Sequence, residues 1–337
     1  MRRILFVLLT GLAITLQARE IAVSSASKGV LKATGMEPGT NCTIEWTHDL
    51  RNSFTNVSPN FENVLVDSNG MIQVKVPLFF RINGIPKVPD GMVPIPAGTN
   101  SGTDPDPDSG AYSLTVEAFN MDAAEVTKAQ WDTVYNWAVA NGYSFVNAGS
   151  GKGTNHPVHS VNWYDCVKWC NARSEMDGKT PCYSVSGSTY KTGQSSPTTD
   201  FDANGYRLPT NDEWEYAARG GVSSQRFPWG NDITHNEANY FSDYVFSYDK
   251  SSTRGSHPSY NAGGEPYTSP VGEFPANGYG LYDMAGNVKE WSNAASGLRG
   301  GSWADQAPSA RCASLWEEFP TGYSYDLNTY GFRCVSR

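Results

Sequence analysis

The stretch RGGSWADQAPSARC, from Arg299 to Cys312, decides the fold assignment of this chain. It combines a glycine pair, a tryptophan and a single cysteine, and it shows neither the two-residue period of a strand nor the 3.6-residue period of a helix. Such a run is typical of a surface loop, and loops held on a rigid scaffold often carry function. The stretch is therefore either a catalytic loop or the frame of a binding surface.

The composition favours a loop-rich domain packed with aromatic side chains. The chain has 337 residues, of which 12% are aromatic and 33 are glycine, while the hydrophobic content is only 39%. That mixture suits irregular structure better than a helical bundle. The formal net charge of -9 argues against nucleic acid and against anionic membranes as partners.

The first residues have the pattern of a secretory signal. Arg2 and Arg3 precede an apolar run that ends in small residues near Ala18. We predict that residues 1–18 are removed and that the mature protein is secreted, or lies in the periplasm or cell envelope. No later segment approaches eighteen apolar residues, so we predict no membrane span.

The remaining chain is long enough for two domains. Residues 19–89 alternate in strand fashion and predict a small β-sandwich-like module, with a hairpin turn at residues 67–70. A proline-rich passage marks the boundary, and residues 91–337 form the second domain. Long segments such as GTNSGTDPDPDSG are predicted to be loops in that domain.

Three helices are predicted in the second domain from their N-terminal capping signals. A Thr or Asn, followed three residues later by a polar side chain, precedes residues 128–140, 163–176 and 211–219. The middle helix is expected to bury one face that carries Trp163, Val167 and Cys170.

Eight motifs in this domain resemble the sulfatase-modifying-factor family, whose founding members are the formylglycine-generating enzymes. In chain order they are MVPIPAG, MDAAEVTKAQW, HPVHSVNWYDCVKWCN, GYRLPTNDEWEYAARGG, FPWGN, ANGYGLYDMAGNVKEW, LRGGSW and GFRCVSR. The resemblance spans residues 92–337. It implies an α+β, C-type-lectin-like fold, in which helices pack on small β-sheets and most of the chain is loop.

The resemblance also implies where catalysis would occur. Formylglycine-generating enzymes oxidise a cysteine with oxygen and a copper ion, and two thiolates that follow the RGGS motif hold the copper. Here the first thiolate position is Asp305, and the second falls in a shortened segment that has no cysteine. Cys312 matches a structural cysteine instead. Since copper(I) requires soft ligands, we expect no copper and assign no catalytic residue.

Calcium is the cofactor that the resemblance implies. Asp283 and Glu290, with carbonyls near Gly286 and Val288, match a family calcium site and supply hard oxygen ligands. The alternative is that the two acids only cap turns. A second family calcium site would use Asn239 and the carbonyl of Tyr240. Its other ligand in the family is an acidic side chain, and glycine, at Gly263, stands at that position here.

The cysteines predict one family disulfide. Cys170 and Cys334 match a pair that ties a helix to the last strand, and an exported protein favours the bond over two free thiols. The family partner of Cys312 falls at Ala218. The pairing of Cys42, Cys166, Cys182 and Cys312 therefore stays open.

Two further groups of residues are candidates for function. His156 and His159 are possible metal ligands, although a framework role is favoured because no third ligand is evident. Aromatic and polar residues near the family's substrate cleft form a possible binding surface, with a packed structural loop as the alternative. They are Trp303, Asp305, Trp316, Tyr323, Tyr325, Asn328 and Tyr330.

Two function classes follow from these observations. The first is an exported binding or structural module that presents its C-terminal loops to a protein or a glycan. The second is an enzyme of the formylglycine-generating oxidoreductase class with a rebuilt site. The missing thiolate pair favours the binding or structural module. The sequence does not determine the oligomeric state.

Overall fold

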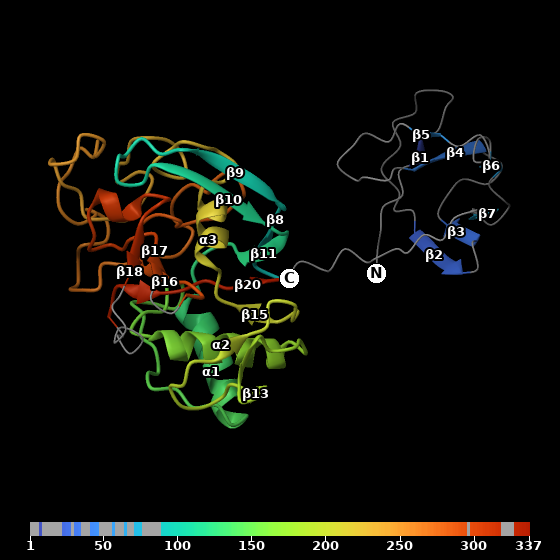
Figure 1. Cartoon of the computed structure of the whole chain (residues 1–337), viewed down its shortest axis with the longest axis horizontal. Coiled ribbons are helices and arrows are strands. Elements are labelled where there is room, and N and C mark those ends of the chain that lie inside the picture. The colour runs from blue at the N-terminus through green and yellow to red at the C-terminus, as the bar shows by residue number, and fades with distance from the viewer. Residues whose placement is uncertain are drawn as a thin grey trace. The chain divides into compact units, whose positions relative to one another are not determined.

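The computed structural model divides the chain into two compact units, Met1–Pro86 and Lys87–Arg337 (Figure 1). Residues 89–294, 297–317 and 327–337 are described in full, and in residues 1–88 only the backbone of the strands is described. Within these residues, no helix is both long and apolar enough to cross a membrane.

The elements described in the first unit are strands, and the predicted hairpin across residues 67–70 is not among them. Strand β6 pairs with β4, whereas β7 pairs with β3, so the strands on either side of this turn belong to different sheets. An alternating pattern fixes which side chains share a face but not which strand is the partner. The strands are β1 (Val7–Leu8), β2 (Ala22–Ser27), β3 (Val30–Thr34), β4 (Asn41–Trp46), β5 (Asn56–Val57), β6 (Val64–Leu65) and β7 (Met71–Lys75).

The second unit contains the three predicted helices, α1 (Lys128–Ala140), α2 (Trp163–Met176) and α3 (Asn211–Ala218). Thr127 and Thr210 form reciprocal capping boxes with Gln130 and Glu213. Asn162 caps α2 from one side only, accepting from the backbone of Asp165 at 2.9 Å. The predicted helix starts are confirmed, because capping depends only on residues three positions apart.

Helix α2 buries the predicted Trp163, Val167 and Cys170, and it is buried on nearly every other side as well. Even Asp165 and Lys168 are buried, with their charged groups 3.3 Å apart. Lys168 Nζ donates to the carbonyls of Ser144 and Gly193, at 2.6 and 3.2 Å. Loops therefore cover the polar side of the helix, and these contacts satisfy charges that solvent would otherwise hydrate.

Small sheets complete this unit and confirm the α+β class. Their strand orders are β10-β9, β15-β20-β11-β8, β13-β12-β14 and β18-β17-β16-β19. The strands are β8 (Met92–Ile95), β9 (Gly98–Thr103), β10 (Ala111–Val116), β11 (Phe119–Asp122), β12 (Tyr183–Val185), β13 (Ser188–Thr189), β14 (Thr198–Thr199), β15 (Tyr206–Arg207), β16 (Lys289–Trp291), β17 (Gly297–Arg299), β18 (Leu315–Glu317), β19 (Tyr330–Gly331) and β20 (Val335–Ser336). Residues 98–103, predicted as loop, are strand β9 because they pair along their length with β10.

Aromatic rings join the helices to the end of the chain. The rings of Trp131 in α1 and Trp169 in α2 stack with centroids 5.9 Å apart and an interplanar angle of 4°. Phe332 packs edge-on against both rings. Figure 1 shows α1 and α2 at one end of this unit and the β9–β10 hairpin at the other, with α3 beside the hairpin.

A buried ion pair connects these parts. Arg333 donates through Nε and Nη2 to both carboxylate oxygens of Glu290 in β16, at 2.7 and 2.6 Å. Trp214 Nε1 in α3 donates to the same carboxylate at 2.7 Å, and Arg333 also donates to the carbonyl of Tyr282 at 2.9 Å. These side chains are almost inaccessible to solvent, so each charge depends on the other.

We expect Arg333→Met to lower the free energy of unfolding by about 3–5 kcal/mol, because Glu290 would stay buried without its counter-charge. The double variant Arg333→Met/Glu290→Gln should recover part of that loss. Urea unfolding of the full chain measures both. Arg337→Met, which removes an arginine from an exposed pair with Asp202, is the matched control and should change stability little. Equal losses for Arg333→Met and Arg337→Met would contradict the role of the buried pair.

Candidate functional site

The glycine pair turns the RGGSW stretch back on itself after β17. Gly300 and Gly301 have φ angles of 83° and 69°, which favour glycine. A Cβ on Gly301 would also lie 2.9 Å from the carbonyl carbon of Ser309. The loop therefore folds tightly, and its residues 307–310 form the short 3-10 helix η2 (Ala307–Ala310).

Arginines hold the loop at both ends. At its start, Arg299 Nη1 lies 3.3 Å from Glu215 Oε2 in α3. At its end, Arg311 donates to both oxygens of Asp108 at 2.9 and 2.8 Å, and lies 3.2 Å from Asp106. Both aspartates belong to the turn between β9 and β10, so this hairpin and α3 fix the loop in place.

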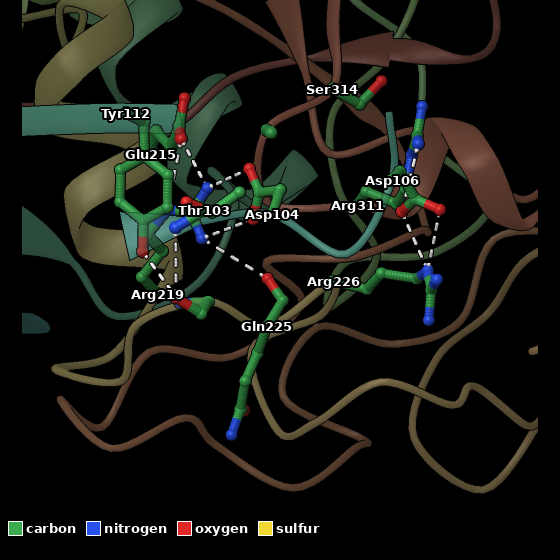
Figure 2. Close-up of polar contacts among 12 residues, drawn as sticks. Thr103, Asp104, Asp106, Tyr112, Glu215, Arg219, Gln225, Arg226, Arg311 and Ser314 are labelled. Carbon is green, nitrogen blue, oxygen red and sulfur yellow. Dashed lines mark hydrogen bonds and ion pairs between the residues drawn. The ribbon is translucent and has the colours of Figure 1, made fainter. Parts of the chain in front are cut away.

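The same turn is held by two further arginines, as Figure 2 shows. Asp104 accepts from Arg219 at 3.0 and 2.8 Å, and Asp106 accepts from Arg226 at 3.0 and 2.8 Å. Within the predicted aspartate-rich loop, Asp104 and Asp106 are thus buried in ion pairs, whereas Asp108 is exposed. The bidentate pair between Arg219 and Asp104 fixes geometry as well as charge.

Asp305, the residue at the expected thiolate position, pairs with Lys289 of β16. Lys289 Nζ lies 2.7 Å from Asp305 Oδ1, and the Ser302 hydroxyl donates to Asp305 Oδ2. The side chains of Lys289 and Asp305 are 10% and 20% exposed. Lys289 Nζ also lies 5.1 Å from the ring centroid of Trp316, a cation-π contact.

A cavity of about 370 Å³ opens beside this pair, and we call it the Asp305 cavity. It is lined by Phe241, Ala304, Asp305, Gln306, Pro308 and Ser309. The backbone of Phe241 donates to the carbonyl of Asp305 at 2.8 Å, and Gln306 Nε2 donates to Asp243 Oδ2 at 2.7 Å. Its volume falls within the range of small-ligand pockets.

The predicted binding surface is only partly exposed. Trp316 is 52% exposed, whereas Trp303 is buried, packs edge-on against Tyr267 and donates from Nε1 to the carbonyl of Asn328 at 3.4 Å. Tyr330 is also buried, against Trp291. Trp303 and Tyr330 therefore pack inside the domain and support the loop, and their role in binding stays a prediction. The predicted Tyr323 and Tyr325 lie outside the described residues.

Sequence reasoning missed Lys289 and Phe241. Lys289 directly precedes Glu290 at the end of the segment that the resemblance assigns to calcium, and these two residues begin strand β16. Successive residues of a strand point to opposite faces of the sheet. A strand at this position would therefore have placed Lys289 on the face opposite Glu290. Nothing in the local sequence of Phe241 places it beside Asp305.

The cysteines described in the structure are all buried. Burial raises the pKa of the Cys312 thiol to about 12 and that of Cys182 to about 11. Burial also raises the pKa of Cys166 and Cys170 well above the usual thiol range. Thiolate is the form that binds metal, and these groups are protonated at neutral pH.

Two cysteines are close enough to support the predicted disulfide. The sulfur atoms of Cys170 and Cys334 lie 3.4 Å apart without a bond between them. Cys166 and Cys182 share the same hydrophobic core, whereas Cys312 lies in a separate core around Trp214. This separation disfavours Cys166 and Cys182 as partners for Cys312.

The first predicted calcium set does not fit an ion as the side chains are placed. Both oxygens of Glu290 are taken by Arg333 and Trp214, so an ion at Glu290 would have to displace a buried counter-charge. The Val288 backbone N–H donates to Glu125 at 3.3 Å. Burial, Asp283 and Glu290 together raise the pKa of Glu125 well above its usual range, a feature that the sequence did not reveal.

Residues of the two predicted sets are nevertheless brought together. Gly286 and Asn239 form a β-bridge, while the Tyr240 carbonyl accepts from His235 Nε2 at 3.1 Å. Asp283 Oδ1 and Asn239 Oδ1 are buried without a partner among the described residues. Within the residues that the structure describes, no group of three or more His, Cys, Asp and Glu side chains is arranged to hold a metal ion. The calcium site stays a prediction.

The two candidate histidines have framework contacts. His156 Nδ1 lies 2.9 Å from the Thr268 hydroxyl, and His159 Nδ1 lies 3.1 Å from the Ser160 hydroxyl. His159 Nε2 is buried and has no partner in the described ranges. Burial, followed by the nearby charges of His156 and Lys128, lowers the pKa of His159 to about 4.

The fold and the glycine-paired loop define an α+β domain of the formylglycine-generating-enzyme type. Residues 82–337 match the sulfatase-modifying factor enzyme 1-like domain, and the chain belongs to this family. The solved structure of CarF superimposes with a TM-score of 0.57 at 27% identity, over 73% of this chain and 97% of that chain.

Relatives in this family differ in their described activity. The formylglycine-generating enzyme of Bos taurus is 33% identical over 62% of this chain, and the inactive C-alpha-formylglycine-generating enzyme 2 of the same species is 40% identical over 39% of it. The chaperone protein LppX of Paenibacillus barcinonensis is 34% identical over 53% of the chain. The chain covers 59%, 44% and 63% of these three relatives, less than two thirds of each.

His159 predicts a loss of stability in acid. Its folded-state pKa of about 4 lies below the ordinary value of 6.5, so the unfolded chain takes up the proton first as the pH falls. The neutral histidine therefore contributes fully above pH 6.5, and its contribution is lost between pH 6.5 and about 4. We expect wild type to lose more stability than His159→Gln between pH 7 and pH 4.5 in urea unfolding. A constant difference between the two proteins across this range would contradict the assignment.

Proposed function

We propose that residues 87–337 act as a binding module through the Asp305 cavity and do not generate formylglycine. The observation that carries the proposal is the ion pair between Lys289 and Asp305 at the position where the family's first copper thiolate is expected. A carboxylate is a hard ligand, and this one is already neutralised by an ammonium group.

The surroundings of the pair support binding rather than oxidation. The described cysteines are buried thiols, and Cys312 lies in a core beneath the loop rather than in the lining of the cavity. The cavity instead offers a half-exposed aromatic ring, Phe241, beside a few fixed polar groups, which is a typical ligand site. Relatives of this chain include an enzyme and a protein described as inactive, so membership of the family does not imply the activity.

We expect no conversion of a cysteine in a sulfatase-derived peptide to formylglycine, even with added copper and reductant, because no accessible thiolate pair adjoins Asp305. Mass spectrometry of the peptide is the measurement, with the Bos taurus formylglycine-generating enzyme as the positive control. Aldehyde formation that depends on Cys312, and so is absent in Cys312→Ser, would refute the proposal and favour an enzyme with a rebuilt site.

The proposal includes export after cleavage near Ala18 and a bond between Cys170 and Cys334. In the chain-entropy account, closing a loop between residues 164 positions apart stabilises the fold by about 4–5 kcal/mol before strain is subtracted. We expect peptide mapping of the mature protein without reductant to recover the two cysteines in one linked peptide. Cys170→Ala should then unfold at lower urea concentration, with Cys312→Ala, which removes another buried thiol, as the control. Alkylation of Cys334 without prior reduction would show that the bond is absent.

A further inference from the structure

We infer that the Asp305 cavity binds a neutral sugar. One ring hydroxyl is hydrogen-bonded to Asp305, which lines the cavity, and its neighbour is hydrogen-bonded to Lys289, whose ammonium lies outside the lining but 2.7 Å from Asp305 Oδ1. This inference rests on the proposed binding function and specifies the class of ligand. It is carried by the hydrogen-bonding capacity that the ion pair leaves unused and by the apolar groups beside it.

Among the residues that the structure describes, the ion pair leaves both donors and acceptors without a hydrogen-bond partner. An ammonium group has three donors, and Lys289 directs one of them to Asp305 Oδ1 at 2.7 Å. The carboxylate of Asp305 has about four acceptor sites, of which Lys289 and Ser302 occupy two. A pair of adjacent hydroxyls meets this arrangement at once, because one oxygen accepts from the ammonium while the other hydroxyl donates to the carboxylate.

Charged ligands fit the same pair poorly. A carboxylate or phosphate would have to draw Lys289 away from Asp305, and an amine would have to draw Asp305 away from Lys289. Either change leaves a partly buried charge without its partner, since the two side chains are only 10% and 20% exposed. The net charge of -9 further disfavours an anion. Neutral hydroxyl groups can form hydrogen bonds with Lys289 and Asp305 while the ion pair stays intact.

The walls of the cavity suit the apolar face of a sugar ring. Phe241 is 37% exposed and lines the cavity together with Pro308 and Ala304. Trp316 is not part of this lining; its ring lies beside Lys289 and is 52% exposed. An extended peptide would need a groove that continues for about 3.3 Å per residue. The lining instead comes from one short loop, residues 304–309, and Phe241.

Affinity electrophoresis of the full chain tests the inference. The probes are three soluble neutral polysaccharides, starch, galactomannan and mixed-linkage β-glucan, and the fully O-methylated form of each. We expect at least one native polysaccharide to retard the protein and its methylated form, which has lost its hydroxyl donors, to have no effect. Asp305→Asn and Lys289→Met should each weaken the retardation at least about tenfold, the range expected for a lost charge-assisted hydrogen bond.

Matched controls separate binding from folding. Asp202→Asn makes the same chemical change at an exposed carboxylate that pairs with Arg337, and it should bind like wild type. Thermal unfolding must show that each variant is folded, and Asp305→Glu, which keeps the charge, should restore part of the binding. Retardation that survives Asp305→Asn and Lys289→Met would place the sugar elsewhere and overturn the inference.

A peptide array probed in parallel distinguishes failure of this inference from failure of the proposed function. One outcome is that a peptide binds, that Asp305→Asn abolishes this binding, and that no polysaccharide retards the protein. This outcome would contradict a sugar as the ligand but would be consistent with the proposed binding function. Absence of both kinds of binding would overturn the inference and the proposed function together.

Discussion

The buried pair between Arg333 and Glu290 is the contact on which the rest of the second unit depends. A charge in this interior is tolerated only with its counter-charge and with its remaining hydrogen bonds satisfied. Meeting that requirement brings four segments together, namely β16, helix α3 through Trp214, the carbonyl of Tyr282 and the end of the chain. Because Glu290 is fixed in this way, the preceding residue of β16, Lys289, is fixed beside Asp305.

A second set of charges holds the loop that carries Asp305. Arg299 and Arg311 stand at its two ends and are bound to acids of α3 and of the β9–β10 turn. A loop of this length would otherwise be costly to order, since each residue fixed on folding loses conformational entropy. Ion pairs therefore hold the irregular segment at both ends, and a preorganised loop of this kind suits a ligand site.

The candidate site could be predicted from the sequence only in part. Asp305 was found from the motif that precedes it, because the expected thiolate position is defined by its distance from the glycine pair. Lys289 and Phe241 were not found, since they reach Asp305 from 16 and 64 positions away in the chain. The sequence assigned Asp283 and Glu290 to calcium, but it could not show that Arg333 takes both oxygens of Glu290.

The sequence by itself determined the family, the α+β class and the starts of the three helices. These features depend on motifs in order and on capping between residues three positions apart, as in Thr127 with Gln130. Only the tertiary structure decided that α2 is buried on nearly every side, that β6 and β7 pair with different strands, and that Asp305 is neutralised by Lys289. Each of these contacts joins residues far apart in the chain. A local sequence pattern indicates the secondary structure and the face of each residue, but it does not determine which distant residues lie next to it.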